Sequence, residues 1–450
     1  MPERGAWAAP KKKVVTSLSY LLYQFIGWFL LLAAAPFFLP SYLPKPRREE
    51  LRQRLGLHNP DRLPQGGKPR LWLHAASVGE VQAARALIEE IKRLLPEATM
   101  IVSTVTRQGR NVARQQLGDS TYCIFAPLDL GLFAARALRT IRPDLYVCLE
   151  TELWPTILRQ AEARNCKLAL LNGRLSERSQ RRYRLIGGLI EKTLRRFAAI
   201  GAIGPADAER FRNLGAPADR VTITGNAKYD LAAAQPAENP AARYRAELQL
   251  PAAAPVWVAG STHSGEEAQL IGAYRTLKRE LPGLIWIVAP RHLRRLPEIE
   301  ALFRAQGVSF DRMSAIAGQV RLHDVILVDT MGELAGLYAA ADYIFCGGSL
   351  VERGGHNLFE AAVWGRPVLY GPSMKDFAEA KALLEEAGGG FPVANAAEIA
   401  SRILDWAAKP EEYAAAAEKA RAAVLNQQGA AKRQAQLLRA LVAMPRPTTG

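Results

Sequence analysis

The sequence predicts an α/β protein with two Rossmann-like domains, preceded by a membrane-anchoring helix. Short β-branched runs alternate with amphipathic helical patterns from Leu71 onward, which is typical of parallel sheets. A Pro- and Ala-rich stretch interrupts the alternation, and a long uncharged apolar segment precedes it. The expected divisions are an anchor at 1–44, a first domain at 45–231, a linker at 232–255, a second domain at 256–410 and a helical tail at 411–450.

The N-terminal segment carries no charge between Lys13 and Lys45, and Leu18–Leu39 is almost wholly apolar. A helix of that length spans about 33 Å, enough to cross a hydrocarbon core of about 30 Å. Basic residues at both ends also suit a helix lying in the membrane interface. A cleaved signal peptide is a third interpretation, supported by Lys11–Lys13 and Ala33–Ala35, although its apolar core is normally shorter. All three interpretations place the chain at a membrane.

The strand candidates form two series, one on each side of the Pro-rich stretch. The first series comprises Leu71–His74, Met100–Val105, Thr121–Phe125, Leu145–Leu149, Leu168–Leu171, Ala199–Ile203 and Val221–Thr224. The second comprises Val256–Ala259, Leu284–Ala289, Val325–Val328, Tyr343–Cys346 and Val368–Tyr370. Ligands of such sheets bind at the carboxyl ends of the strands, so the loops there are the candidate sites.

The net charge of +16 is confined to the first half of the chain. Residues 1–230 contain 36 basic and 20 acidic side chains, whereas residues 231–450 contain 23 of each. A basic half indicates an anionic partner: a nucleic acid, a membrane surface or a phosphorylated substrate. The four cysteines lie far apart without a C-x-x-C pair, which predicts reduced core thiols and neither a zinc site nor a disulfide framework.

The densest motif is the segment Gly347–Pro372, where glycine pairs follow a predicted strand and a helix is expected to start near Asn357. Exposed N–H groups at that start would hold a phosphate. His356 and Glu360 share a helix face, so Glu360 could accept hydrogen bonds from ribose hydroxyls. The alternative is an ordinary junction in which Asn357 caps the helix.

A second motif, Leu71–Gln82, joins a strand to a helix through small residues. Ser77 and Glu80 have the spacing of a capping box, which is the structural interpretation. In the functional interpretation Glu80 removes a proton from an attacking hydroxyl. The helix start is expected to lower the pKa of Glu80.

Three shorter segments carry further charged candidates. Glu150 and Glu152 follow a predicted strand, and Lys228 follows another. Five arginines occur within eleven residues from Arg174, either as a solvated face or as a phosphate-binding patch. No H-E-x-x-H, P-loop or metal-spaced His/Cys group occurs in the sequence.

Together these segments resemble the Kdo transferases, membrane-associated glycosyltransferases that move 3-deoxy-D-manno-octulosonic acid (Kdo) from CMP-Kdo to a lipid A precursor in Gram-negative bacteria. The resemblance covers nearly the whole chain in order. It departs at Thr156, Ser264 and Ala361, where the family leads us to expect Asn, Glu and Pro. It implies a GT-B fold, with two facing Rossmann-like domains and a cleft between them, and inversion at the anomeric carbon without a metal or other cofactor.

By position, the resemblance implies that Glu80 is the general base and that Glu152 and Lys228 stabilise the transition state. We expect Glu150, Arg174 and Arg178 to bind the acceptor. The implied donor-binding residues, which contact CMP, are Pro290, Arg291, Met331, Gly332, Glu333, Asn357, Leu358, Phe359 and Glu360.

The implied partners are CMP-Kdo, the phosphorylated lipid A precursor lipid IVA and cytoplasmic-membrane lipid, with no nucleic acid. The implied location is the inner membrane, with an N-terminal anchor and catalytic domains on the cytoplasmic face. One alternative is another GT-B nucleotide-sugar transferase or a sugar-nucleotide epimerase, although an epimerase needs no anchor. Another is a membrane-tethered binding protein, which would leave the Gly347–Glu360 segment unexplained.

Overall fold

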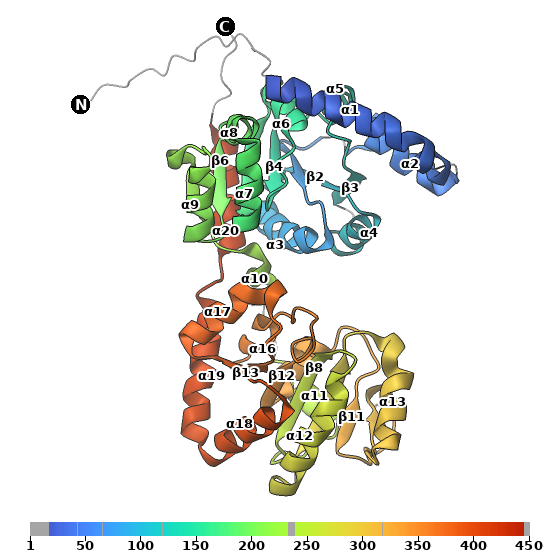
Figure 1. Cartoon of the computed structure of the whole chain (residues 1–450), viewed down its shortest axis with the longest axis vertical. Coiled ribbons are helices and arrows are strands. Elements are labelled where there is room, and N and C mark those ends of the chain that lie inside the picture. Colours follow the sequence, from blue (N-terminus) through green and yellow to red (C-terminus); the bar gives the residue numbers. More distant parts are fainter. Residues whose placement is uncertain are drawn as a thin grey trace, which may run out of the picture. The chain divides into compact units, whose positions relative to one another are not determined.

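The computed structural model describes residues 18–42, 44–64, 66–118, 120–232, 239–316 and 318–444. The chain divides into a first unit, Met1–Lys228 with Gly429–Gly450, and a second unit, Tyr229–Gln428 (Figure 1). The predicted domain boundary after residue 231 lies just beyond this division. Lys11–Lys13 and residues 233–238 of the predicted linker lie outside the described residues.

The first unit contains a seven-stranded parallel sheet in the order β3-β2-β1-β4-β5-β6-β7. Its strands are β1 Arg70–His74, β2 Thr99–Thr104, β3 Thr121–Phe125, β4 Leu145–Leu149, β5 Lys167–Gly173, β6 Ala199–Ala202 and β7 Val221–Ile223. Its helices are α1 Leu18–Phe38, α2 Lys45–Arg54, α3 Val78–Leu94, α4 Arg107–Gln116, α5 Gly131–Ile141, α6 Pro155–Glu162, α7 Glu177–Leu185, α8 Gly187–Leu194, α9 Pro205–Asn213, α10 Ala227–Ala232 (which continues into the second unit) and α20 Ala430–Ala443.

Alternate residues of each strand point to opposite faces of this sheet, and helices cover both. Trp72 packs in one core with residues of α5, α6, α8 and α9. Its neighbours Leu71 and Leu73 pack in another core with residues of α3 and α20. Because both faces are covered, the strands are continuous apolar runs, and this is why the sequence predicted them well.

The second unit contains another seven-stranded sheet, in the order β10-β11-β9-β8-β12-β13-β14. Its strands are β8 Val256–Thr262, β9 Ile285–Pro290, β10 Asp311–Arg312, β11 Val325–Leu327, β12 Tyr343–Cys346, β13 Val368–Tyr370 and β14 Gly390–Pro392. Its other helices are α11 Ala241–Glu247, α12 Glu266–Glu280, α13 Leu296–Ala305, α14 Met313–Ile316, α15 Leu334–Ala340, α16 Phe359–Ala362, α17 Ala378–Ala387, α18 Ala396–Ala408 and α19 Pro410–Leu425.

The strand order reverses at the same place in both sheets. β1 lies between β2 and β4, and β8 lies between β9 and β12. The carboxyl ends of β1 and β8 are therefore the topological switch points, where doubly wound sheets bind ligands.

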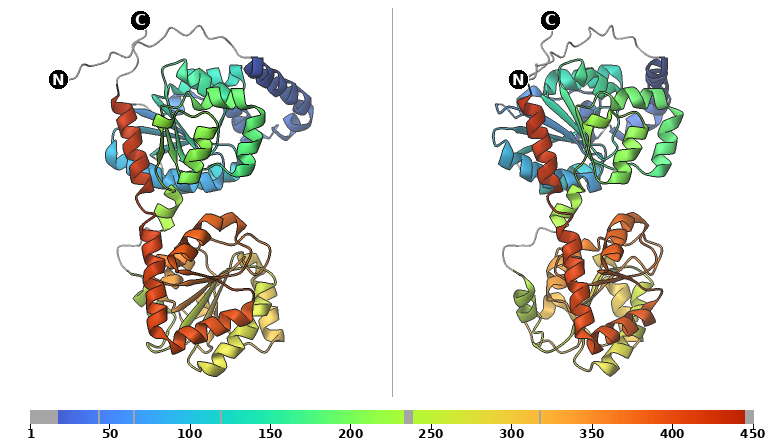
Figure 2. Two further views of the ribbon diagram at one scale, coloured as in Figure 1. Left: turned by 60° about the vertical axis from the view of Figure 1, so that its left-hand side comes forward. Right: turned by 90° about the vertical axis from the view of Figure 1, so that its left-hand side faces the viewer.

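The two α/β domains with parallel sheets confirm the predicted fold class. The short strands β10 and β14 were missed, because two or three residues are too few to show a pattern. The predicted helical tail contains two helices, α19 and α20. The first of these belongs to the second unit and the other to the first unit. Figure 2 shows α20, in red, alongside the first unit's sheet, where Ala435 and Leu438 join its core. All four cysteines are buried free thiols, as predicted.

Candidate active site

A cluster of charged side chains lies at the carboxyl ends of the central strands of the first unit. We call Glu80, Glu150, Glu152 and Lys228 the carboxylate cluster. Glu80 lies in the first turn of α3, which follows β1; Glu150 and Glu152 follow β4; and Lys228 follows β7 in the first turn of α10. Parallel strands bring these loops to one edge of the sheet, although the residues are far apart in sequence.

Ser77 forms the predicted N-cap of α3, and Glu80 is buried beside it, with 6% of its surface exposed. Its carboxylate accepts hydrogen bonds from the Ala76 N–H at 2.8 Å and the Ser77 hydroxyl at 2.9 Å, while Ser77 Oγ accepts from the Glu80 N–H. Burial and the neighbouring charge of Glu152 raise the pKa of Glu80 to about 7. The prediction of a lowered pKa was wrong, because burial outweighs the two hydrogen bonds.

Glu152 differs from Glu80 because it keeps its charge. Burial would raise the pKa of Glu152, but the adjacent His74 ring and the Trp154 N–H lower it below the ordinary value. The Trp154 Nε1–H donates to Glu152 at 2.7 Å, and His74 Nε2 lies 3.7 Å from the same oxygen. An ionised Glu152 therefore lies close enough to Glu80 to disfavour a second negative charge there.

A buried chain of polar groups orients His74, which the sequence analysis did not single out. Ser103 Oγ accepts from Trp72 Nε1–H at 2.8 Å and lies 2.9 Å from His74 Nδ1. We take the Ser103 hydroxyl as the donor and His74 Nδ1 as the acceptor. In this tautomer the ring carries its hydrogen on Nε2, which faces the Glu152 carboxylate. His74 is thus a positioning residue for Glu152. The sequence signal was a polar residue ending an apolar strand.

Lys228 forms an ion pair with Glu150. Its ammonium group also lies near Gly79, the residue before Glu80, because a Cβ added to Gly79 would be 3.5 Å from Lys228 Nζ. The Ala227 N–H donates to Asn172 Oδ1 at 2.8 Å, which ties this loop to the end of β5. Glu150 and Asn172 both have positive φ, at 57° and 54°. Non-glycine residues in that region are uncommon and concentrate at functional sites.

The predicted acceptor-binding arginines are exposed. Arg174 directly follows β5, at the same edge of the sheet as the carboxylate cluster, whereas Arg178 lies on α7. Their exposure leaves both guanidinium groups accessible to an anion.

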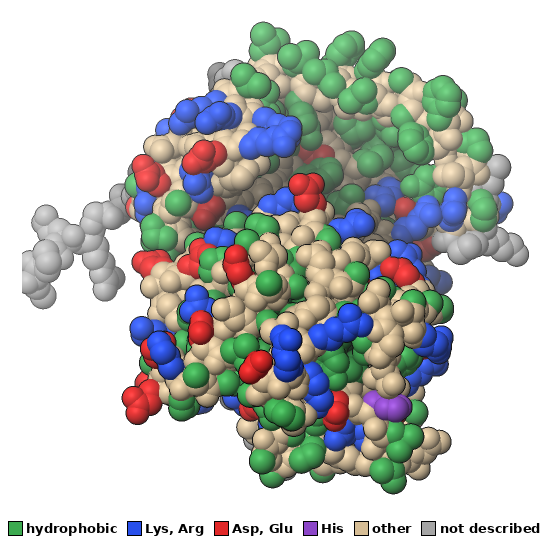
Figure 3. Space-filling view, turned by 60° about the horizontal axis from the view of Figure 1, so that its bottom comes forward, with side chains coloured by type: hydrophobic (Ala, Val, Ile, Leu, Met, Phe, Trp, Pro, Cys, Tyr) green, Lys and Arg blue, Asp and Glu red, His purple; other side chains and the backbone are tan. Residues whose placement is uncertain are grey.

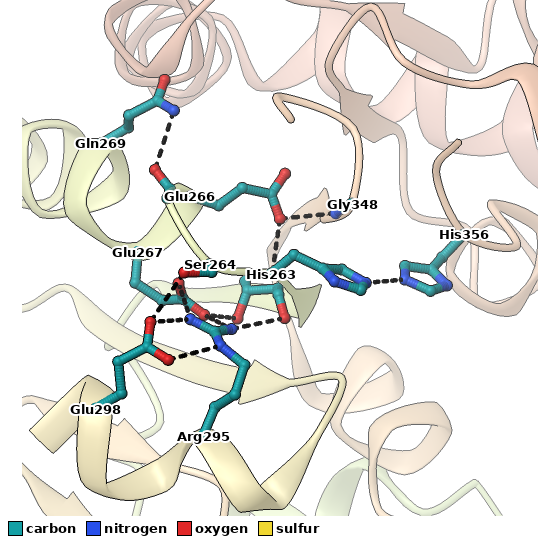
Figure 4. A network of polar contacts seen from close by, with 11 residues as sticks. His263, Ser264, Glu266, Glu267, Gln269, Arg295, Glu298, Gly348 and His356 are labelled. Carbon is teal, nitrogen blue, oxygen red and sulfur yellow. Dashed lines mark hydrogen bonds and ion pairs between the residues drawn. The ribbon is translucent and has the colours of Figure 1, made fainter. Parts of the chain in front are cut away.

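The glycine segment of the second unit is organised by a carboxylate. Glu266, at the start of α12, accepts hydrogen bonds from the N–H groups of four residues, at 2.7 to 3.0 Å: His263, Gly348, Ser349 and Leu350. Figure 4 shows Glu266 reaching Gly348 across the end of the sheet. The N–H groups of Gly348–Leu350 are therefore occupied by Glu266, whereas the predicted phosphate site, at the start of the following helix, stays a prediction. The helix itself starts at Phe359, with Asn357 Oδ1 accepting from the Phe359 N–H at 3.1 Å.

Three histidines lie beside this loop, and we call His263, His292 and His356 the histidine cluster. The Nε2 atoms of His263 and His356 are 3.0 Å apart, in nearly parallel rings, and His292 meets His263 edge-on. Burial and the positive charge of Arg291 lower the pKa of His356 to about 4. Burial lowers the pKa of His263 as well. The rings of His263 and His356 are therefore uncharged at neutral pH.

Arg295 fastens the loop that carries His263. Its guanidinium binds both oxygens of buried Glu267, at 2.8 and 2.9 Å, and also Glu298 at 3.0 Å (Figure 4). Ser264, one of the departures from the family pattern, donates to Glu298 at 2.9 Å. This network holds the carboxyl end of β8 against α13.

The structure places the predicted donor-binding residues in three loops at the carboxyl ends of β9, β11 and β12. Arg291 is exposed, and its charge acts on both His356 and Glu360, whose pKa is raised by burial. The side chains of Leu358 and Phe359 are fully buried in the core, so only their backbone could face a ligand.

The loop after β11 supplies Met331, Gly332 and Glu333. Met331 is 68% exposed, and Gly332 has a φ of 91°. Glu333 accepts a hydrogen bond from the Tyr244 hydroxyl. Pro290 ends β9 and is buried. Within the described part of the chain, no group of three or more His, Cys, Asp or Glu could hold a metal ion.

A family model and sequence relatives indicate the family of the chain. The family model described as 3-deoxy-D-manno-octulosonic-acid transferase (kdotransferase) matches residues 49–231. The 3-deoxy-D-manno-octulosonic acid transferase of Haemophilus influenzae is 32% identical, covering 80% of this chain and 83% of the relative. The Bordetella pertussis protein of that name is also 32% identical, covering 81% and 85%. The UDP-GlcNAc 2-epimerase of Neisseria meningitidis, solved with UDP-GlcNAc, covers 82% of this chain and all of its own at 15% identity and a TM-score of 0.56, which shows the fold alone.

Proposed function

The chain belongs to the 3-deoxy-D-manno-octulosonic acid (Kdo) transferase family, and on that premise we propose that it moves Kdo from CMP-Kdo to the phosphorylated lipid A precursor lipid IVA with inversion, Glu80 being the general base. Membership of this family makes the protein a glycosyltransferase of lipopolysaccharide biosynthesis. The observation that carries the proposal is a buried glutamate whose pKa of about 7 lies at the working pH, at the switch point of the first sheet.

A glutamate with this pKa is a competent base at neutral pH, since a substantial fraction is ionised and the proton it accepts is held firmly. In the proposed step, a hydroxyl oxygen of the acceptor attacks the anomeric carbon of Kdo as its proton passes to Glu80. The bond from that carbon to the phosphate oxygen breaks on the opposite face, and its electron pair leaves with CMP.

The rest of the carboxylate cluster suits the charges that develop in this step. Glu152 stays ionised, so it favours positive character on the sugar, and Lys228 favours negative charge on the departing phosphate. Donor binding is assigned to the second unit, where Arg291 is exposed beside Glu360. Glu360 would accept hydrogen bonds from the ribose, and Arg174, Arg178 and Glu150 would contact the acceptor. These roles and the cleft between the domains remain predictions.

The proposed reaction uses no metal or other cofactor, because cationic side chains supply the charge stabilisation. The proposed location is the cytoplasmic face of the inner membrane, where the basic first half meets an anionic leaflet and a phosphorylated lipid. One apolar helix of sufficient length to cross a membrane, α1, supports membrane attachment.

The deciding experiment is transfer by the detergent-purified protein, with CMP-Kdo generated in situ, tetraacyl lipid A precursor as acceptor and products resolved by mass. We expect the lipid to gain the mass of at least one Kdo unit, and chelator to leave the rate unchanged. CMP release without a heavier lipid would contradict the acceptor, and a loss of activity that divalent metal restores would contradict the metal-free mechanism.

A further inference from the structure

One face of helix α1 packs against the first unit. Its half-buried residues follow helical spacing along almost its whole length: Tyr20, Tyr23, Gln24, Gly27, Trp28, Leu31, Ala34 and Ala35. We call this set the docking stripe. Positions three and four apart share one face of a helix, so a single face of α1 is covered. The polar side chains of the covered face lie in its N-terminal half.

Specific hydrogen bonds hold the stripe against the first unit. The Tyr23 hydroxyl donates to Asp129 at 2.9 Å, and this buried carboxylate also accepts from the N–H groups of Thr156 and Ile157 at the start of α6. Gln24 uses both ends of its amide: Oε1 accepts from the Gly131 N–H at 2.9 Å, and Nε2 donates to Thr156 Oγ1.

Ring contacts and a close approach extend the docking to either side of these hydrogen bonds. Arg159 lies over the Tyr20 ring, 4.3 Å from its centroid, and Trp28 packs on Phe133 at 5.3 Å. A Cβ on Gly27 would come within 2.7 Å of the Leu130 side chain, so glycine permits the close approach of the helix. The contacts join α1 to α5, α6 and the loops before them.

The opposite face of α1 is apolar and open. Its large exposed side chains are Leu18, Leu21, Leu22, Phe25, Ile26, Phe29, Leu30, Leu32, Phe37 and Phe38, between 47% and 82% exposed. Figure 3 shows hydrophobic side chains gathered along the upper edge of the molecule, over this helix. An exposed apolar surface of this extent marks a membrane or protein interface.

We infer that α1 lies in the plane of the membrane, fixed to the first unit by its docking stripe and inserting its apolar face into the cytoplasmic leaflet. This inference rests on the proposed membrane location and goes beyond it. A helix that spans the bilayer has lipid on all sides, so α1 would have to leave the first unit. That would break the Tyr23 and Gln24 hydrogen bonds, place both polar side chains in hydrocarbon and uncover Asp129.

The charges around α1 favour an anionic leaflet as the occupant of this surface. Exposed Arg47, Arg48 and Arg52 follow the helix on α2. The helix α1 also contacts α8, which begins just after the exposed pair Leu185–Ile186 and the arginine-rich α7. Apolar side chains bordered by arginines suit the boundary between acyl chains and anionic headgroups.

The topology can be tested by cysteine labelling, because all four native cysteines are buried. Thr16→Cys before α1, Ser41→Cys after it and Val320→Cys on the second unit would be treated with a membrane-impermeant maleimide in inverted inner-membrane vesicles. We expect all three to be labelled without detergent. Labelling of Thr16→Cys only after detergent would show that α1 spans the membrane and would overturn the inference. So would a mature chain that begins after Ala35.

A second experiment tests which face meets the lipid. We expect Phe25→Ser with Phe29→Ser to reduce binding to phosphatidylglycerol-containing vesicles at least tenfold. The matched control, Val320→Ser with Leu322→Ser, removes exposed apolar side chains from the second unit and should leave vesicle binding unchanged. Unchanged vesicle binding by the Phe25/Phe29 variant would show that lipid does not cover this face. If the same variant also changed a dimer into a monomer, a second copy of the chain would be the occupant.

The two proposals fail separately. Transfer in detergent micelles with Thr16→Cys labelled from the far side would retain the transferase and overturn the in-plane helix. Labelling of all three cysteines from the cytoplasmic side, with no Kdo transfer in detergent, would retain the in-plane helix and overturn the transferase.

Discussion

The carboxylate cluster of the first unit and the histidine cluster of the second occupy equivalent positions, each at the carboxyl end of the strand where its sheet reverses order. In both, burial shifts a titratable group toward its uncharged form. The pKa of Glu80 rises to about 7, and that of His356 falls to about 4. The same desolvation acts on groups of opposite charge, so the two pKa values move in opposite directions.

The two groups differ in how far the pKa of each lies from neutral pH. Glu80 can gain and lose a proton at pH 7, which suits it to proton transfer. His356 stays uncharged at pH 7, so the charge beside the glycine loop comes from Arg291. The buried carboxylate in the second unit, Glu266, is surrounded by four backbone N–H groups and has a structural role.

The largest expected effect is on Glu80, whose replacement should nearly stop Kdo transfer without changing donor binding by the second unit. Glu80→Gln keeps the size of the side chain and removes the base, so kcat for Kdo transfer should fall about 10²- to 10⁴-fold. CMP affinity, measured by calorimetry, should be unchanged. Turnover within tenfold of wild type would leave Glu80 as a helix cap only.

Removing the Glu266 carboxylate should destabilise the second unit. Glu266→Ala leaves four backbone N–H groups without their acceptor, and we expect a loss of about 2–4 kcal/mol in the free energy of unfolding. Hydrogen exchange should report this loss in the second unit and not in the first. Glu298→Ala is the matched control, because this exposed carboxylate should contribute about 0–1 kcal/mol. Equal effects of the two variants would refute the organising role of Glu266.

The lowered pKa of His356 predicts a pH-dependent stability. An unfolded histidine titrates near 6.5, so the unfolded state binds more protons between pH 6.5 and 4, and stability falls as the pH falls through that window. The contribution is about 2 kcal/mol after allowance for partial solvent screening. Denaturant unfolding of wild type and His356→Gln at pH 7.5 and 4.5 should show a smaller decrease for the variant. Parallel decreases would mean that His356 is accessible to protons when folded.

A smaller effect tests the electrostatic coupling within the carboxylate cluster. The pH profile of kcat should rise through about pH 7 as Glu80 ionises. Glu152→Gln removes the charge that helps to raise the pKa of Glu80, so its profile, normalised to its own plateau, should move to lower pH. His74→Ala should have the same direction of effect, since it favours protonation of Glu152. An unmoved profile in both variants would show that burial alone sets the pKa.

The smallest expected effect concerns the exposed arginines of the first unit. Replacing Arg178 and Arg182 with Gln should raise KM for the phosphorylated acceptor about two- to fivefold at low salt and less at high salt, because salt screens exposed charges. The control is KM for CMP-Kdo, which should not change. A salt-independent effect on KM would indicate that these arginines act through packing.

Much of the fold was predictable because its signals are local. The sequence predicted β3, β4, β12 and β13 with their observed bounds, since each is a short apolar run flanked by turn residues. Ser77 caps α3 as the capping-box spacing predicted. The apolar segment also predicted α1, because its composition alone sets it apart from the rest of the chain.

The properties of the sites depended on residues that are distant in sequence. Burial together with Glu152 raised the pKa of Glu80, and Glu266 occupied N–H groups more than eighty positions away. The orientation of α1 was likewise decided by Asp129 and Thr156, which give Tyr23 and Gln24 their partners. Local spacing determines where strands, caps and apolar helices form, but pKa values and docking faces follow from which side chains the fold brings together and how far it excludes water from them.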